Sequence, residues 1–465
     1  MSTAIEEVLS IRGSSPAEGE VTITGADPVH STRFKVSETL AAVHAGIGVA
    51  VSDIWELKTG RRQKTRIDVR HAAAAVKSAY YLQRPDANGV LQDVVNTEHL
   101  AMREMTQPWP TRDGRWFLPH FGLPNLRARV LKVLDCEATP DAVGKAVAKW
   151  NGLDLETAID EARACGGMVR THEEWIATPH GSALAGKPIV EIIKIADSAP
   201  EPLPKTDRPL DGLRVLDLTR ILAGPMSART LAEHGADVLM VIADRLPHIP
   251  EHVIDTNHGK RSCFLDLSKA DEAATLKTLV ASADVFTQGY RKGTMDKFGF
   301  SPDEVARLRP GIIYTSINCY GHEGPFSHRA GWEQLGQTVT GICHENAVDG
   351  RPALLPVPAC DYTTGGLAAY GTLLALARRA REGGSYHVRV SLCQSGMFIR
   401  RQGKLAPEVK PIALTREELE ALRIESQTHE GPYRHLGPCL QLSETPPRWS
   451  RPPPKLGSDQ PEWLG

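Results

Sequence analysis

The sequence lacks the signatures of several large classes of protein. Its eight cysteines include no Cys-x-x-Cys pair, which argues against a zinc site or a disulfide framework and fits a reducing compartment. No Gly-x-Gly-x-x-Gly follows a predicted strand, and neither a P-loop nor a Gly-x-Ser-x-Gly motif occurs. These absences weaken a nicotinamide, an ATP and a hydrolase interpretation.

An excess of charge and long apolar runs are also missing. The net charge is -2 over 465 residues, so electrostatics give no reason to expect nucleic acid as a partner. The longest apolar runs are interrupted by His44 and Asp53 or are too short to span a bilayer, and the N-terminal residues lack the apolar core of a signal peptide. We therefore expect a cytoplasmic protein without a membrane partner.

Composition and periodicity divide the chain into segments of different character. The expected segments are a loosely attached lead-in (1–35), a helix–strand unit (36–88), a small α+β domain (89–196), a Pro-rich linker (197–209), a Rossmann-like domain (210–402), and a charged helix with an extended tail (403–465). Asp113-Gly114 predicts a hairpin turn in the small domain. The tail is either a disordered end or a strap that wraps the domain or a partner.

Residues 213–317 carry the clearest fold signal. Short apolar strands alternate with helices there, as is typical of a parallel sheet covered on both faces. The predicted fold class is therefore α/β, with a Rossmann-like large domain and a separate small α+β domain. Sheets of this kind bind ligands at the carboxyl ends of their strands.

Asp361 is the candidate nucleophile. A Pro-punctuated stretch, residues 356–366, delivers its carboxylate to the expected start of an apolar helix, where free N–H groups and the helix dipole favour the ionised form. Gly365 and Gly366 are expected to let a substrate approach the backbone, so that nearby N–H groups form an oxyanion site. A simple helix cap is the alternative role for Asp361. Cys360 is a rival nucleophile, although a buried small residue is its simpler interpretation.

The unit around Asp361 is repeated near the N-terminus. Glu38 precedes Gly60 by the same interval as Asp361 precedes Gly383, and each interval ends in a turn followed by a strand. A real repeat would place Glu38 at the position equivalent to Asp361. Two carboxylates could then face one site, or Glu38 could be a vestige.

Motifs in the second half resemble class III CoA-transferases, the superfamily of formyl-CoA transferase, carnitine CoA-transferase and α-methylacyl-CoA racemase. The resemblance lies in residues 209–225 with Gly-Ala-Asp-Val at 235–238, His-Gly-Lys-Arg-Ser at 258–262, Tyr-Arg-Lys-Gly at 290–293, residues 320–331, and Asp361-Tyr-Thr-Thr-Gly. Residues 36–200 and the tail resemble later parts of such a domain, in a rearranged and partly duplicated order.

The resemblance implies the class III fold, an interlocked homodimer, and catalysis by Asp361. A coenzyme A thioester would be a co-substrate, a carboxylic acid the acceptor, and no covalently bound cofactor or metal is expected. The candidate catalytic residues are Asp361, Gly365, Gly366 and Glu38. The candidate CoA-binding residues are Arg220, Ile221, Leu222, Ala223, Lys260, Arg261, Tyr290, Arg291, Lys297 and Phe298.

The expected reaction passes CoA through an aspartyl anhydride and an aspartyl-CoA thioester. An acyl-CoA racemase or isomerase is the alternative enzyme, with Glu333 or His322 as a second base. Trp332 stands where the racemase branch keeps a histidine, and an indole is neither acid nor base. A CoA-binding protein without turnover is the alternative from another class.

Overall fold

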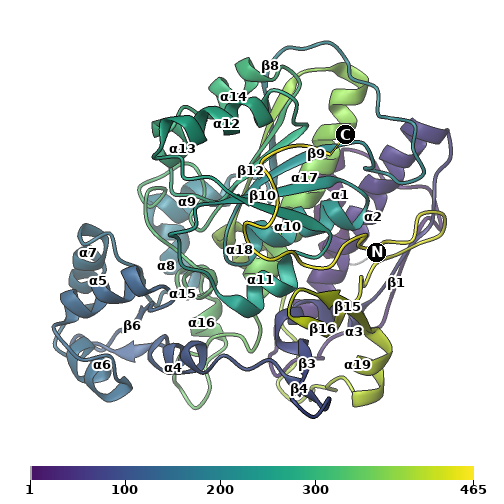
Figure 1. Cartoon of the computed structure of the whole chain (residues 1–465). Coiled ribbons are helices and arrows are strands. Elements are labelled where there is room, and N and C mark those ends of the chain that lie inside the picture. The colour runs from purple at the N-terminus through teal and green to yellow at the C-terminus, as the bar shows by residue number, and fades with distance from the viewer. Residues whose placement is uncertain (1–2, 465) are drawn as a thin grey trace.

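The protein is built around a seven-stranded sheet, described by a computed structural model of residues 3–464 (Figure 1). The strand order is β11-β10-β9-β12-β13-β14-β8, and only β8, at one edge, is antiparallel. The strands are β8 (Glu191–Ala196), β9 (Arg214–Leu218), β10 (Asp237–Ile242), β11 (Lys260–Phe264), β12 (Val285–Gln288), β13 (Ile313–Asn318) and β14 (Ser385–Ser391). The α/β class is confirmed.

Both faces of this sheet are covered. Along β9, Val215 packs in one core cluster and the next residue, Leu216, in another, as the two-residue period of a strand requires. Helices α10 and α17 belong to the first cluster, and α12 and α14 to the second. The helices of this part are α10 (Ala223–Glu233), α11 (Pro250–Thr256), α12 (Ala270–Val280), α13 (Thr294–Lys297), α14 (Pro302–Leu308), α15 (Glu333–Thr340), α16 (Ile342–Glu345), α17 (Ala359–Glu382) and α18 (Leu392–Arg401).

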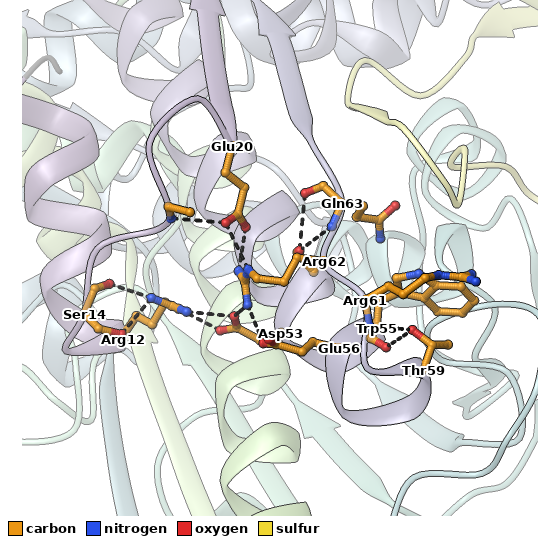
Figure 2. Close-up of polar contacts among 12 residues, drawn as sticks. Arg12, Ser14, Glu20, Asp53, Trp55, Glu56, Thr59, Arg61, Arg62 and Gln63 are labelled. Carbon is orange, nitrogen blue, oxygen red and sulfur yellow. Dashed lines mark hydrogen bonds and ion pairs between the residues drawn. The ribbon is translucent and has the colours of Figure 1, made fainter.

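The expected loose lead-in is instead ordered structure. The first unit contains α1 (Thr3–Arg12), β1 (Val21–Thr24), α2 (Val36–Thr59), β2 (Thr65–Asp68), α3 (Val69–Ala75) and the 3-10 helix η1 (Ser78–Tyr81). Arg12 and Arg62 both pair with the carboxylate of Asp53 on α2, and Arg62 also pairs with Glu20 and Glu56 (Figure 2). This network holds α1 and the residue just before β1, Glu20, against α2. Local periodicity in the sequence could not reveal such a link.

Helices α2 and α17 have matching surroundings. Each has 24 residues, a non-helical N-cap with nearly the same backbone angles, and a glycine C-cap, and each is followed by a strand and a short helix. Asp27 accepts from the backbone N–H of Glu38, just as Glu333 accepts from that of Asp361. The two helices pack side by side, with Gly366 against Val43.

Helix α2 is long and apolar enough to cross a membrane by length and composition alone. However, 83% of its most apolar window lies buried inside the protein. Its position beside α1, α3 and α17 is that of a core helix.

The small unit projects from the rest of the molecule through its helices α4 to α7, whereas its α8 and α9 pack against α15 and α18 (Figure 1). It contains α4 (Thr97–Met105), β5 (Trp109–Pro110), β6 (Trp116–Pro119), α5 (Pro124–Leu134), α6 (Pro140–Val147), α7 (Gly152–Glu161), β7 (Gly166–Met168), α8 (His172–Ala177) and α9 (Pro179–Ala185). The predicted hairpin joins β5 to β6 through Asp113-Gly114. The expected end of the unit at residue 196 is wrong in one respect, because β8 belongs to the large sheet.

The tail lies along the domain surface as a strap. It contains α19 (Arg416–Leu422), β15 (Arg423–Thr428), β16 (Gly431–Leu436) and β17 (Gln441–Leu442). β15 and β16 share a sheet with β3 (Gln83–Pro85) and β4 (Leu91–Asp93), and β17 pairs with β2. Farther on, the backbone N–H of Gly259 donates to the Arg451 carbonyl oxygen, and Trp449 stacks on His258. The tail therefore links the first unit to the edge of the large sheet.

Candidate active site

Asp361 is the third residue of α17 and borders a cavity of about 190 Å³. The side chain is mostly buried, with 8% of the residue exposed. The lining residues come from the strand ends of the large sheet, from the turns that follow them, and from the small unit. They are Leu123, Leu218, Thr219, Arg220, Ile221, Leu222, Ala223, Gly224, Gly289, Tyr290, Ile317, Asn318, Cys319, Gly331, Trp332, Glu333, Asp361 and Leu392.

Glu333 is the immediate electrostatic neighbour of Asp361. Its carboxylate accepts the backbone N–H groups of Cys360, at 3.1 Å, and of Asp361, and so caps α17. Burial raises the pKa of Glu333 to about 7. Burial and the charge of Glu333 together raise the pKa of Asp361 well above its ordinary value, while the Ala223 backbone N–H acts in the opposite direction. The expectation that the helix end favours the ionised form of Asp361 is therefore wrong, because desolvation and a second acid outweigh the helix dipole.

Gly365 and Gly366 do not form an oxyanion site. Both lie inside α17, one turn beyond Asp361, and neither borders the cavity. A Cβ on Gly365 would lie 2.6 Å from the Ala223 carbonyl oxygen, and one on Gly366 would lie 2.6 Å from Val43 Cγ1. These glycines let α10 and α2 approach α17 closely, which corrects the expected role.

Glu38 stands at the position in α2 equivalent to Asp361 but does not border this cavity. Its carboxylate accepts the backbone N–H of Asp27 at 3.0 Å, and Lys35 lies 3.9 Å away. The structure therefore does not bring the two carboxylates to one cavity.

Half of the candidate CoA-binding residues do line the cavity: Arg220, Ile221, Leu222, Ala223 and Tyr290. The first three form the turn between β9 and α10, Ala223 begins α10, and Tyr290 follows the end of β12. Ile221 has a φ of 75°, a conformation that costs a β-branched residue about 1–3 kcal/mol. Helix α10 begins at this turn, and no side chain caps its N-terminus. The backbone N–H of Ala223, the first residue of α10, donates toward the Asp361 carboxylate.

Two expected phosphate-binding cations are structural instead. The Lys260 ammonium is fully buried, 2.7 Å from the Asp217 carboxylate, and also donates to the Pro225 carbonyl. Arg261 forms a two-pronged ion pair with Asp237. Both cations are occupied inside the sheet, which corrects their assignment as CoA ligands.

The other three candidates do not line the cavity. Arg291 is half-buried and donates to the Arg163 carbonyl, Lys297 is exposed, and Phe298 packs against the core cluster that also contacts Tyr290. Burial, and then the neighbouring Arg163 and Arg129, lower the pKa of Arg291. These three residues follow Tyr290 in the chain but do not line the cavity.

The alternative nucleophile and the alternative base His322 do not line the cavity. Cys360 is fully buried and does not border the cavity, and burial raises the pKa of its thiol. His322 also lies outside the cavity, and burial lowers its pKa to about 4. Trp332 lines the cavity, with its ring 4.7 Å from that of His120 in the small unit.

Sequence reasoning missed the contribution of the small unit. Leu123 borders the cavity from the loop before α5, although it is far from Asp361 in the chain. Thr219 and Asn318 were missed too, and their positions at the ends of β9 and β13 were the available signal.

A group able to hold a metal ion lies elsewhere. Ligand atoms of His99, Glu251 and His252 are within 4.8 Å of one another. His99 Nδ1 is 2.6 Å from a Glu251 oxygen, and Asn96 donates to the other oxygen. These contacts already satisfy Glu251 without an ion.

Comparison with known proteins identifies the family of the chain. Residues 210–406 match the model of CoA-transferase family III. An acetyl-coenzyme A transferase of Hypoxylon pulicicidum is 30% identical over 408 residues, 78% of this chain and 69% of the relative. Succinyl-CoA:glutarate CoA-transferase of Mus musculus is 34% identical over 202 residues, 40% of this chain and 46% of the relative.

Part of the chain is also similar to a solved structure. A CAIB/BAIF family protein from Brucella suis is 30% identical, with a TM-score of 0.40, over 49% of this chain and 65% of that protein. The match to most of the Hypoxylon relative, together with the family model, shows that the chain belongs to CoA-transferase family III.

Proposed function

We propose that the protein moves CoA from an acyl-CoA donor to a carboxylate acceptor through covalent intermediates on Asp361. The observation that carries this proposal is the Asp361 carboxylate at a cavity, facing the uncapped N-terminus of α10. The family and the names of its relatives support the reaction class. Coenzyme A enters as a thioester co-substrate, and no other cofactor is required.

The reaction has two half-reactions, joined by an aspartyl-CoA thioester, and each half-reaction passes through an anhydride on Asp361. An Asp361 oxygen attacks the thioester carbonyl, the C–S bond breaks, and an acyl-aspartyl anhydride and CoA thiolate form. The thiolate attacks the aspartyl carbonyl, releasing the donor carboxylate and leaving an aspartyl-CoA thioester. The acceptor carboxylate then displaces CoA, and the thiolate attacks the acyl carbon of this second anhydride, which frees acyl-CoA and Asp361.

The turn after β9 supplies electrostatic stabilisation. Each attack places negative charge on a carbonyl oxygen, and the N–H groups that begin α10 are fixed donors at the positive end of a helix. Arg220 and Tyr290 line the cavity, and Arg291, Lys297 and Phe298 follow Tyr290 in the chain. These residues form the CoA site of the proposal.

The test is to trap the intermediate with hydroxylamine after incubation with an acyl-CoA and to locate the label by mass spectrometry. We expect it on Asp361, and we expect Asp361→Asn to lower kcat by about a thousandfold or more. Glu38→Gln is the matched control, since it makes the same carboxylate-to-amide change at the equivalent position of α2, and its rate should match wild type. Label on Glu38 or Cys360 would refute the assignment.

A further inference from the structure

A second cavity of about 730 Å³ lies beside the Asp361 cavity. Leu123 borders both cavities. Gly122, which borders the larger one, has its Cβ position 3.1 Å from the Trp332 ring of the smaller one. Arg220, from the smaller cavity, donates to the carbonyl of Pro247, which lines the larger. The two spaces are therefore neighbours across a thin wall of side chains.

The larger cavity has the size and much of the lining of a site for an organic molecule. Its volume falls in the range of small-molecule sites, about 300–1,000 Å³. Met102 and Leu123 from the small unit meet Ile249, Val253 and Ile254 of the α11 region across it. Charged side chains of both signs also border it, namely Arg84, Glu98, Arg127, Glu251, Glu430 and Lys455.

The position of the larger cavity relative to the candidate CoA-binding residues decides which part of a substrate the cavity would hold. Tyr290, Arg291 and Lys297 do not border the larger cavity. A thioester with its carbonyl at Asp361 has CoA on one side and its acyl group on the other. In the proposed function CoA lies on the side of Tyr290, after the end of β12. The acyl group then points to the opposite side, toward Leu123 and the larger cavity. Because the acceptor leaves as an acyl-CoA, donor and acceptor acyl groups use this space in turn.

We propose that the larger cavity is the acyl-group site and that it selects bulky, mainly apolar carboxylic acids over small ones. This inference rests on the proposed CoA transfer at Asp361. A small acid such as acetate is held by the 190 Å³ cavity alone, whereas a larger acid also removes the apolar surface of the second cavity from water. That additional burial favours the larger acid in kcat/KM.

The experiment measures transfer of CoA to acetate, succinate, octanoate and 1-pyrenebutyrate, together with direct binding of 1-pyrenebutyrate by fluorescence. Val253→Trp fills the larger cavity. Val348→Trp makes the same change at a residue that is 60% exposed and lines neither cavity, and it is the matched control.

We expect octanoate and 1-pyrenebutyrate to exceed acetate in kcat/KM by about tenfold or more. Val253→Trp should remove that advantage and weaken 1-pyrenebutyrate binding while leaving acetate within about twofold, and Val348→Trp should change neither. Equal rates for all the acids, or an equal loss for acetate and the larger acids in Val253→Trp, would overturn the acyl-site assignment and leave the transferase proposal standing. No transfer to any acid, with no adduct on Asp361, would overturn both.

Discussion

Asp361 and Glu333 are two acids at one edge of a small cavity, and their separate tasks follow from their contacts. Glu333 accepts the backbone N–H groups at the start of α17, so its charge is stabilised by donors. Asp361 borders the cavity, and among the described residues the Ala223 N–H is the donor that lowers its pKa. Besides burial, the charge of Glu333 raises the pKa of Asp361, so the titration belongs to the pair.

Glu333→Gln should shift the acid limb of kcat/KM to lower pH by about one unit. Attack requires an ionised Asp361, so activity falls as the pH drops through the raised pKa of the pair. Removing the neighbouring negative charge lowers that pKa and extends activity toward acid. The measurement is a pH–rate profile.

Asp27→Asn is the control for this profile, because Asp27 caps the equivalent helix α2 without bordering the cavity. Its acid limb should coincide with that of wild type. An unmoved limb, or one displaced to higher pH, in Glu333→Gln would contradict the pairing.

At the scale of elements, the site depends on how α10 meets α17. The turn before α10 provides cavity-lining residues and α17 provides the carboxylate, so their separation sets the distance from nucleophile to backbone donors. Gly365 permits that separation, because the Ala223 carbonyl oxygen occupies the space that a Cβ at this position would need.

Gly365→Ala should lower the free energy of unfolding by about 1–3 kcal/mol, despite the better helix propensity of alanine. The new Cβ would lie 2.6 Å from a backbone oxygen and 2.9 Å from Met226 Cβ, so the helices must move apart. Urea unfolding measures the change. Gly186→Ala, whose added Cβ meets its nearest atom at 4.0 Å, should stay within about 0.5 kcal/mol. Equal stability of the two variants would show that α10 and α17 are not packed through this glycine.

At the scale of the whole molecule, one chain supplies both sides of the cavity. The large domain contributes Asp361 and Trp332, while the small unit contributes Leu123 and the His120 ring beside Trp332. The homodimer expected from the sequence stays a prediction. Because residues of one chain line the cavity from both units, we expect turnover without a second copy.

The specific activity should therefore stay constant within about twofold when the protein is diluted through any dimer dissociation. Sedimentation velocity gives the mass at each concentration, and initial rates give turnover per chain. A rate per chain that falls in step with the loss of dimer would show that a second copy completes the site.

Part of this protein could be predicted from its sequence. The alternation of apolar strands and helices, the start of a helix near Asp361, and the match between the Glu38 and Asp361 units all depend on residues close together in the chain. Local patterns of this kind are set by short-range geometry, which a sequence displays directly.

Only the tertiary structure decided what the charged residues do. Lys260 and Arg261 resemble CoA ligands in sequence, yet buried acids on neighbouring strands, Asp217 and Asp237, neutralise them. Asp361 resembles an exposed anion, yet burial and Glu333 raise its pKa. Desolvation and pairing depend on residues that are distant in the chain, and so do the two cavities. The small unit borders the smaller cavity together with strand ends of the large sheet, and the larger cavity together with the α11 region and the tail.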